Sequence, residues 1–181
     1  MAEENANVRK RVIHTTADFS YADNLCFSKD AVKIGIDALK SGATIVTDTT
    51  MAFSGINKTY LSKLGGEAHC FIADEDIKET AKQRGITRSF ASMEKAAKLY
   101  DNLIVAVGNA PTALISLYEL INKGEISPKL IIGVPVGFVN VVASKELIMQ
   151  TDIPYIVARG RKGGSNVAAA ICNSLIYTAS A

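Results

Sequence analysis

The chain has 181 residues, of which 48% are hydrophobic and 21% charged, so it has enough apolar material for the core of one domain and is not generally disordered. Twenty Lys and Arg side chains against eighteen Asp and Glu leave a formal net charge of +2, a balance that does not favour nucleic-acid binding. The sequence contains no apolar run long enough to span a membrane, and its first ten residues are polar, unlike a secretion signal. We therefore expect a soluble, cytoplasmic domain without nucleic-acid or membrane partners.

Short apolar segments alternate with longer amphipathic segments along the chain. Five of them read as buried strands, because they are rich in β-branched residues and are bounded by Gly, Pro or Asp: residues 43–48, 68–72, 102–107, 129–132 and 154–158. Helices are predicted between Ser28, as the N-cap, and Gly42, and over residues 77–84, 89–99, 111–122 and 165–177.

This alternation is typical of a parallel sheet covered by helices on both faces. We expect residues 1–181 to form one three-layer α/β/α domain, Rossmann-like, with a mostly parallel sheet of about five strands. Residues 1–10 are expected to be poorly ordered or atypical.

Ligands of such sheets bind beyond the carboxyl ends of the strands, near the point where the strand order reverses. Four segments follow predicted strands and are rich in Gly, Asn, Thr or Arg: residues 48–51, 108–112, 133–140 and 159–166. These residue types allow close backbone approach and offer hydrogen bonds, so the site is expected among them.

Residues 159–165, Arg-Gly-Arg-Lys-Gly-Gly-Ser, place three cations and three glycines between a predicted strand and a predicted helix. Glycines let backbone N–H groups face a ligand, and a helix N-terminus adds partial positive charge, so the segment suits an anion. The segment matches neither GxxxxGK[ST] nor GxGxxG, which disfavours a nucleotide-binding protein. A solvated basic loop is the alternative.

The two histidines differ in their surroundings. His14 follows Arg11 by three residues, one helical turn, so an imidazole that gives or takes a proton would lie beside a cation that can hold a substrate carboxylate. A structural role is the alternative for His14. His69 lies within an apolar run and is expected to be a core or supporting residue.

Three further residues have both a functional and a structural interpretation. Asn109 is either a ligand contact or a turn residue, and Asp48 is an acid, a helix cap or a ligand contact. Arg88 opens a predicted helix, where a cation is unfavourable beside the helix dipole, so an anion could sit there; an ordinary surface Arg is the alternative.

No metal-binding pattern is present. Cys26, Cys70 and Cys172 lie far apart without a CxxC pair, so free buried thiols are expected, and neither histidine belongs to an HExxH motif. We expect no protein-built metal site.

The motifs at these positions resemble the precorrin-8X methylmutase family, called cobalt-precorrin-8 methylmutase in the anaerobic route. The matching stretches are VIHTTADF (residues 12–19), VTDTTM (46–51), SGI (54–56), GITRS (85–89), VGNAPTAL (107–114), GVPVGFVN (133–140), SKE (144–146) and PYIVARGRKGGS (154–165). They cover nearly the whole chain from about residue 11 onward, in the expected order.

The resemblance implies an isomerase of cobalamin biosynthesis that moves a methyl group from ring carbon 11 to 12 of precorrin-8X, or of its cobalt form, giving hydrogenobyrinate or cobyrinate. It implies that His14 is the proton donor, and that substrate is contacted by Arg11, Thr15, Thr49, Arg88, Asn109, Arg159 and Gly160. It also implies a homodimer and no separate cofactor, since any cobalt would arrive inside the tetrapyrrole substrate.

Members of this family carry a longer segment before the histidine motif, whereas thirteen residues precede His14 here. Part of the cover over the substrate is therefore expected to be absent, replaced or supplied by a partner subunit. A non-catalytic corrinoid-binding or carrier relative is the alternative to the enzyme.

Overall fold

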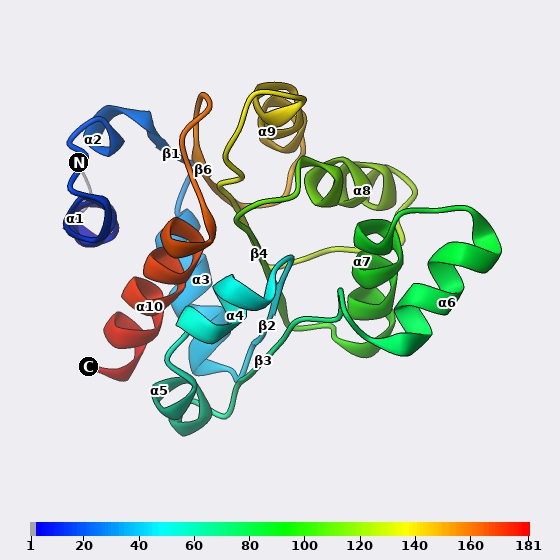
Figure 1. Cartoon of the computed structure of the whole chain (residues 1–181). Helices are drawn as coiled ribbons and strands as arrows, with labels where there is room; N and C mark the ends of the chain where they lie inside the picture. Colours follow the sequence, from blue (N-terminus) through cyan, green and yellow to red (C-terminus); the bar gives the residue numbers. More distant parts are fainter. Residues whose placement is uncertain (1–2) are drawn as a thin grey trace.

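A six-stranded sheet with helices on both faces forms the centre of the computed structural model, which describes residues 3–181 (Figure 1). The strands are β1 (Leu25–Phe27), β2 (Thr44–Thr47), β3 (Glu67–His69), β4 (Leu103–Val107), β5 (Leu130–Gly133) and β6 (Tyr155–Ala158), in the spatial order β1-β6-β5-β4-β2-β3. All neighbouring strands are parallel except β1, which pairs antiparallel with β6. The predicted three-layer α/β fold with a mostly parallel sheet is confirmed.

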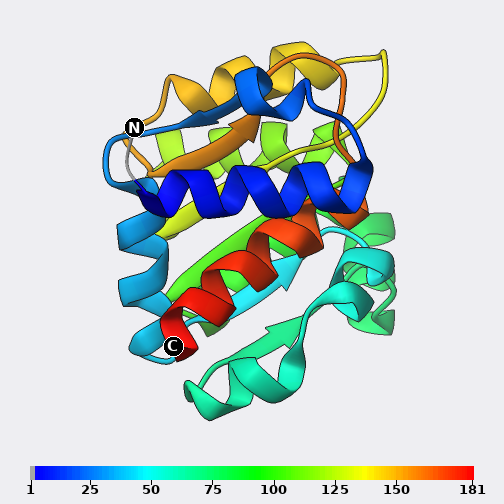
Figure 2. The same ribbon diagram turned by 90° about the vertical axis from the view of Figure 1, so that its left-hand side faces the viewer.

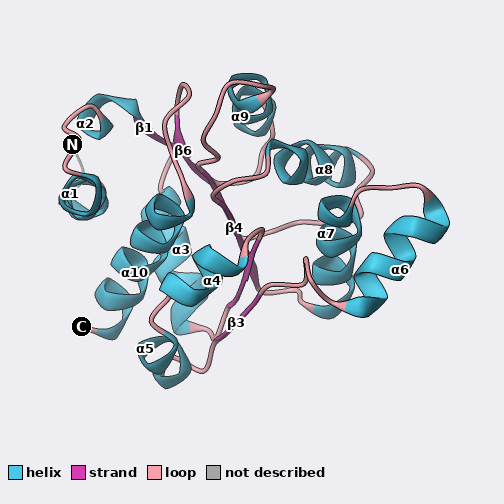
Figure 3. Cartoon of the chain, viewed as in Figure 1, coloured by secondary structure: helices cyan, strands magenta, loops and turns pink. Residues whose placement is uncertain are grey.

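The helices are divided between the two faces (Figure 3). One face is covered by α1 (Glu3–Thr16), α3 (Ala31–Lys40), α4 (Thr50–Gly55), α5 (Lys58–Lys63) and α10 (Ser165–Ser180), and the other by α6 (Glu75–Arg84), α7 (Arg88–Leu99), α8 (Pro111–Asn122) and α9 (Val141–Met149). The short helix α2 (Tyr21–Asn24) leads into β1. None of the helices in the described part of the chain is long and apolar enough to cross a membrane.

Each face of the sheet has its own hydrophobic core, as the alternation along β4 shows. Ile104 and Ala106 are buried among the residues of the α10 side, while Leu103, Val105 and Val107 are buried on the α8 side. This burial on both faces explains the continuous apolar runs of the central strands.

The structure corrects three expectations. The sheet has six strands rather than about five, because the three-residue edge strand β1 was not predicted. Residues 3–10, expected to be poorly ordered or atypical, form the first turns of α1, in which Val8 and Val12 are buried; the rest of the segment, residues 1–2, lies outside the described residues. Ser28 does not cap α3: Asp30 precedes that helix, and the Ser28 hydroxyl instead accepts a hydrogen bond from the Tyr155 N–H at 2.8 Å.

The N-terminal and C-terminal helices lie side by side on one face, as Figure 2 shows for α1 in dark blue and α10 in red. The helices that follow β2 and β4 lie on opposite faces of the sheet. Strand β2 is followed by α4 on the α10 face, and β4 is followed by α8 on the other face. The loops after these two neighbouring strands therefore diverge, which is the topology that places ligand sites at their carboxyl ends.

Candidate active site

Asp48 organises the point where the strand order reverses. The residue follows β2 directly, is 4% exposed, and accepts hydrogen bonds from the backbone N–H groups of Gly108 (2.8 Å), Asn109 (2.9 Å) and Ala110 (2.7 Å). Burial raises the pKa of the Asp48 carboxyl, while these three N–H groups oppose the rise. Asp48 thus satisfies the backbone donors of the loop that leads from β4 into α8.

The ends of β2, β4 and the start of α10 meet at this position. The Thr49 hydroxyl accepts a hydrogen bond from the Ala52 N–H at 3.0 Å, capping α4, and lies 2.8 Å from the Ser165 hydroxyl. A Cβ on Gly108 would lie 2.6 Å from the Ser165 Cα, so only glycine allows this approach. The structure thus brings together the loops that carry Thr49 and Asn109, and the Asn109 side chain is exposed.

Arg88 lies near the same edge of the sheet. The residue is exposed at the first position of α7, and no carboxylate among residues 3–181 forms an ion pair with it. The next residue, Ser89, accepts a hydrogen bond from the Thr112 hydroxyl at 3.3 Å, which joins the starts of α7 and α8. Arg88 therefore lies one residue from a contact between the starts of α7 and α8.

His14 and Arg11 face a separate groove between α1 and α10. The groove has a volume of about 660 Å³ and is lined by Asn7, Lys10, Arg11, His14, Ser174, Tyr177, Thr178 and Ala181. The Arg11 guanidinium lies over the Tyr177 ring, 4.8 Å from its centre, and His14 and Thr15 are exposed. No hydrogen bond between described residues joins His14 to the cluster around Asp48.

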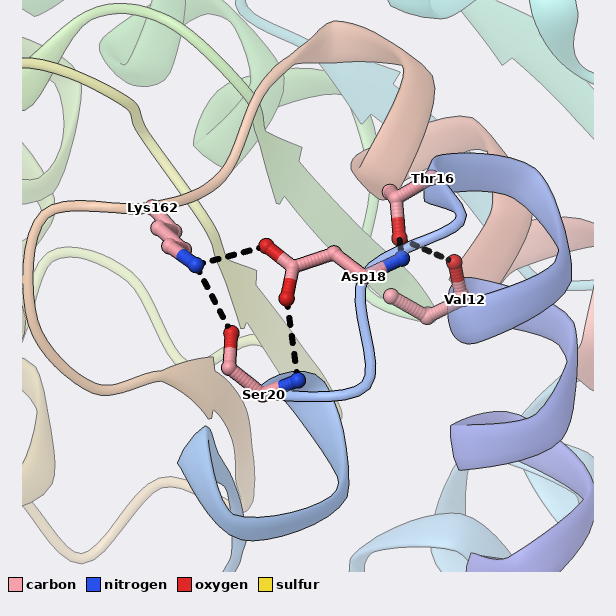
Figure 4. A network of polar contacts seen from close by, with 5 residues as sticks. All are labelled: Val12, Thr16, Asp18, Ser20 and Lys162. Carbon is pink, nitrogen blue, oxygen red and sulfur yellow. Dashed lines mark hydrogen bonds and ion pairs between the residues drawn. The ribbon is translucent and has the colours of Figure 1, made fainter.

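A network of polar contacts fixes the end of α1 to the basic loop, residues 159–164 (Figure 4). The Lys162 ammonium donates hydrogen bonds to Asp18 Oδ2 at 2.7 Å and to the Ser20 hydroxyl at 3.0 Å. Asp18 Oδ1 accepts the Ser20 N–H at 2.9 Å, and the Asp18 N–H is 3.2 Å from the Thr16 hydroxyl, which donates to Val12 O at 2.8 Å. The hydrogen bond from Lys162 is the main reason that the pKa of Asp18 is lowered to about 2.

The basic loop has partners that its sequence did not reveal. Arg159, predicted to contact an anion, forms a two-point ion pair with Glu146 at 2.9 and 3.3 Å. The Gly160 carbonyl accepts a hydrogen bond from the Lys145 ammonium at 2.8 Å, so its oxygen faces the protein interior. Arg161 lies over the exposed ring of Phe138, 5.4 Å from its centre.

The remaining histidine and the cysteines have structural positions. His69 is half-buried on edge strand β3, and its ring stacks near those of Phe71 and Tyr100, 5.6 and 5.7 Å between centres. The three cysteines are free thiols; Cys172 is buried, which raises its pKa to about 12, and the other two are partly exposed. Within residues 3–181, no three His, Cys, Asp or Glu side chains are grouped so that they could hold a metal ion.

Sequence reasoning missed two residues of this region, Lys145 and Asp18. Both belong to stretches that match the family resemblance, SKE and VIHTTADF, which is the one signal that could have pointed to them. Their partners lie 15 to 144 residues away in the sequence, so no local pattern reveals them.

Comparison with known proteins places these features in one family. A family model described as precorrin-8X methylmutase matches residues 1–178. The chain is 50% identical over 169 residues to the cobalt-precorrin-8 methylmutase of Salmonella typhimurium (93% of this chain, 79% of the relative), and 44% identical over 187 residues to that of Leptospira interrogans (99% and 85%). A crystal structure of the precorrin-8X methyl mutase from Thermus thermophilus superposes with a TM-score of 0.90 at 39% identity, covering 99% of this chain and 88% of that one. The chain belongs to the precorrin-8X methylmutase family, the methyl-shifting isomerases of cobalamin biosynthesis.

Proposed function

We propose that this protein moves the methyl group on ring carbon 11 of precorrin-8X or cobalt-precorrin-8 to carbon 12, with His14 as the proton donor. The observation that supports this role is the exposure of His14 in one groove with Arg11, whose guanidinium is held on the Tyr177 ring. An exposed imidazole beside a fixed cation can approach a substrate that carries carboxylates at its edge.

The reaction is an isomerisation, so a proton given to the ring must later be returned. The His14 imidazolium donates a proton to the macrocycle as the methyl group leaves carbon 11. The imidazole takes a proton back once the bond to carbon 12 has formed. Such a positioned acid contributes on the order of a hundredfold to ten-thousandfold in rate, and the remaining acceleration comes from holding the ring in a geometry suited to migration.

The substrate contacts are assigned to residues on α1, in or beside its groove with α10, and to residues at the carboxyl ends of the strands. Arg11, Arg88 and the cations of the basic loop suit peripheral carboxylates, and Thr15, Thr49, Asn109, Arg159 and Gly160 complete the proposed set. The side chains of Phe19, Met51, Phe138 and Val139 are 73 to 81% exposed, and they suit the apolar faces of the macrocycle. The protein is proposed to act in the cytoplasm as a homodimer, with a tetrapyrrole and not a nucleic acid as its ligand.

Anaerobic incubation with precorrin-8X and, separately, cobalt-precorrin-8 tests this function, with conversion followed by visible absorption. We expect wild type to form the corrin chromophore and His14→Ala to bind the substrate but to convert it at least about a hundredfold more slowly. His69→Phe is the matched control, because it removes the other imidazole while keeping a ring between Phe71 and Tyr100. Conversion by His14→Ala at the wild-type rate would exclude His14 as the donor. Binding without conversion by wild type would instead support the non-catalytic carrier.

A further inference from the structure

Lys145 is a charged residue that is fully buried beneath the basic loop. It lies on α9 with 0% exposure, and its ammonium donates hydrogen bonds to Gly160 O at 2.8 Å and Lys162 O at 2.9 Å. None of the acidic side chains in residues 3–181 forms an ion pair with Lys145; the two acids that contact this loop, Glu146 and Asp18, are paired with Arg159 and Lys162. Burying an ammonium without a counter-ion is destabilising, so its presence calls for a role other than stability.

The two hydrogen bonds determine which way the loop faces. In a planar trans peptide the C=O of one residue and the N–H of the next point in opposite directions. Since the carbonyls of Gly160 and Lys162 point at Lys145, the N–H groups of Arg161 and Gly163 point away from it. These two N–H groups have no hydrogen-bond acceptor among the described residues, whereas the neighbouring Gly164 N–H donates to Val134 O at 2.9 Å.

The loop has little freedom to turn these groups elsewhere. A Cβ on Gly163 would lie 2.1 Å from Val134 O, and the Gly137 N–H donates to Arg161 O at 3.1 Å, so the loop is pressed against residues 134–137. The Lys162 side chain is held by Asp18. The outward face of the loop therefore combines two fixed backbone donors with the Arg161 guanidinium, a combination that suits a carboxylate.

We propose that Lys145 is a positioning residue: it holds the 159–164 loop so that the N–H groups of Arg161 and Gly163 bind one peripheral carboxylate of the substrate. The inference rests on the proposed function for the identity of the ligand and adds a specific recognition element to it. The bound carboxylate also brings a negative charge close to the buried ammonium, which the protein itself does not provide.

Three variants test the role of Lys145. Lys145→Met keeps the length of the side chain without its donors, Lys145→Gln keeps donors without the charge, and Lys82→Met removes one exposed cation on α6 as a control. The readouts are KM and kcat for the substrate, and the Kd values of the corrin product and of its fully amidated form. The loss of hydrogen bonds to a charged group predicts roughly a tenfold to hundredfold rise in KM and in the Kd of the carboxylate form for Lys145→Met, with kcat within about threefold of wild type.

The amidated product distinguishes recognition from general damage. Wild type should prefer the carboxylate form, Lys145→Met should lose this preference, Lys145→Gln should recover part of it, and Lys82→Met should match wild type. A folded Lys145→Met with the wild-type KM and preference would overturn the inference. So would an equal loss of affinity for both forms of the product.

A measurement on the wild-type protein covers the case in which Lys145→Met does not fold. Hydrogen exchange of the Arg161 and Gly163 amides should slow when the product is bound, and unchanged exchange at both would overturn the inference. Wild type that binds the product but does not convert the substrate would overturn the proposed function and leave this inference standing. Wild type that does not bind the product at all would overturn both.

Discussion

The Asp18 carboxylate and the Lys162 ammonium meet at 2.7 Å although 144 residues separate them in the sequence. One belongs to the segment that follows α1, the helix that carries His14, and the other to the basic loop after β6. The pair therefore connects the proposed proton donor with the proposed carboxylate site. Because the pKa of Asp18 lies at about 2, mainly through this hydrogen bond, the Asp18 carboxylate stays ionised in neutral and mildly acidic solution.

Asp18→Asn should lower kcat/KM by up to about fivefold, because a solvent-exposed ion pair of this kind is screened by water and contributes little. The contribution to stability is present above the ordinary Asp pKa and is lost as the pH falls towards 2, so the variant and wild type should differ in stability at pH 5 and converge near pH 2. Steady-state kinetics and urea unfolding at the two pH values measure this. Asp37→Asn, which breaks the exposed Lys33–Asp37 pair on α3, should leave kcat/KM unchanged. Equal effects of the two variants on kcat/KM would contradict a role of the Asp18–Lys162 pair in linking the His14 helix to the basic loop.

Asp48→Asn should lower the free energy of unfolding by about 1 to 3 kcal/mol, because one carboxylate oxygen becomes an NH₂ group that faces a backbone donor. Activity should fall as well, since the Asn109 loop loses its support. Urea unfolding and kcat/KM together measure the effect. Asp101→Asn, at an exposed position before β4, is the control and should behave as wild type. A wild-type unfolding midpoint for Asp48→Asn would be incompatible with this support of the 108–110 loop.

Gly108→Ala should be destabilising by about 1 to 3 kcal/mol and should reduce activity, because the new methyl group meets the backbone of Ser165 and Gly164 at 2.6 to 2.9 Å. Gly133→Ala, at the end of the neighbouring strand β5, places its methyl group at ordinary contact distances of 3.4 Å from side chains and should change stability much less. Thermal unfolding of the two variants provides the comparison. If they unfold alike, the close approach of β4 to α10 does not constrain the site.

Lys145→Met should change the pH dependence of stability. Burial lowers the pKa of folded Lys145 to about 8, whereas the unfolded residue keeps its proton until about 10.5. Between these values the unfolded chain binds more protons, so the stability of wild type relative to Lys145→Met should rise from pH 8 to pH 10, by up to about 3 kcal/mol. Urea unfolding of both proteins at pH 7, 8, 9 and 10 measures the difference. A difference that stays constant over this range would show that Lys145 has an ordinary pKa.

The elements that sequence patterns predicted are those whose signals are local. The five predicted strands and the helix over residues 111–122 have strong apolar patterns and clear boundaries, and all are present. Edge strand β1 has three residues, too few for a pattern, and exists because it pairs with β6 far along the chain. Helix α1 buries little besides Val8 and Val12 and is stabilised by packing on α10, which no window of sequence contains.

In the candidate site, too, features with a local sequence signal were predicted, and contacts between distant residues were not. The strand-end loops were predicted as the ligand region, and the structure places Thr49 and Asn109 together there. The partners of these loops were not predictable, because Asp48 binds N–H groups 60 to 62 residues away and Lys145 binds carbonyls 15 and 17 residues away. Arg159 is a further case: its pairing with Glu146 joins residues 13 apart in the sequence, and its role as a substrate contact stays a prediction.

The antiparallel direction of β1 determines at which edge of the sheet the N-terminal segment lies. Leu25, the first residue of β1, pairs with Ala158, the last residue of β6, and the Arg159 N–H donates to Asn24 O at 2.8 Å. The chain thus enters this strand from the edge at which all the other strands terminate, and α1 delivers Asp18 to that edge. A parallel first strand would have been entered from the opposite pole of the sheet, with the histidine helix anchored far from the basic loop. The orientation of three edge residues, among them the buried Leu25, therefore places the segment after the His14 helix beside the basic loop.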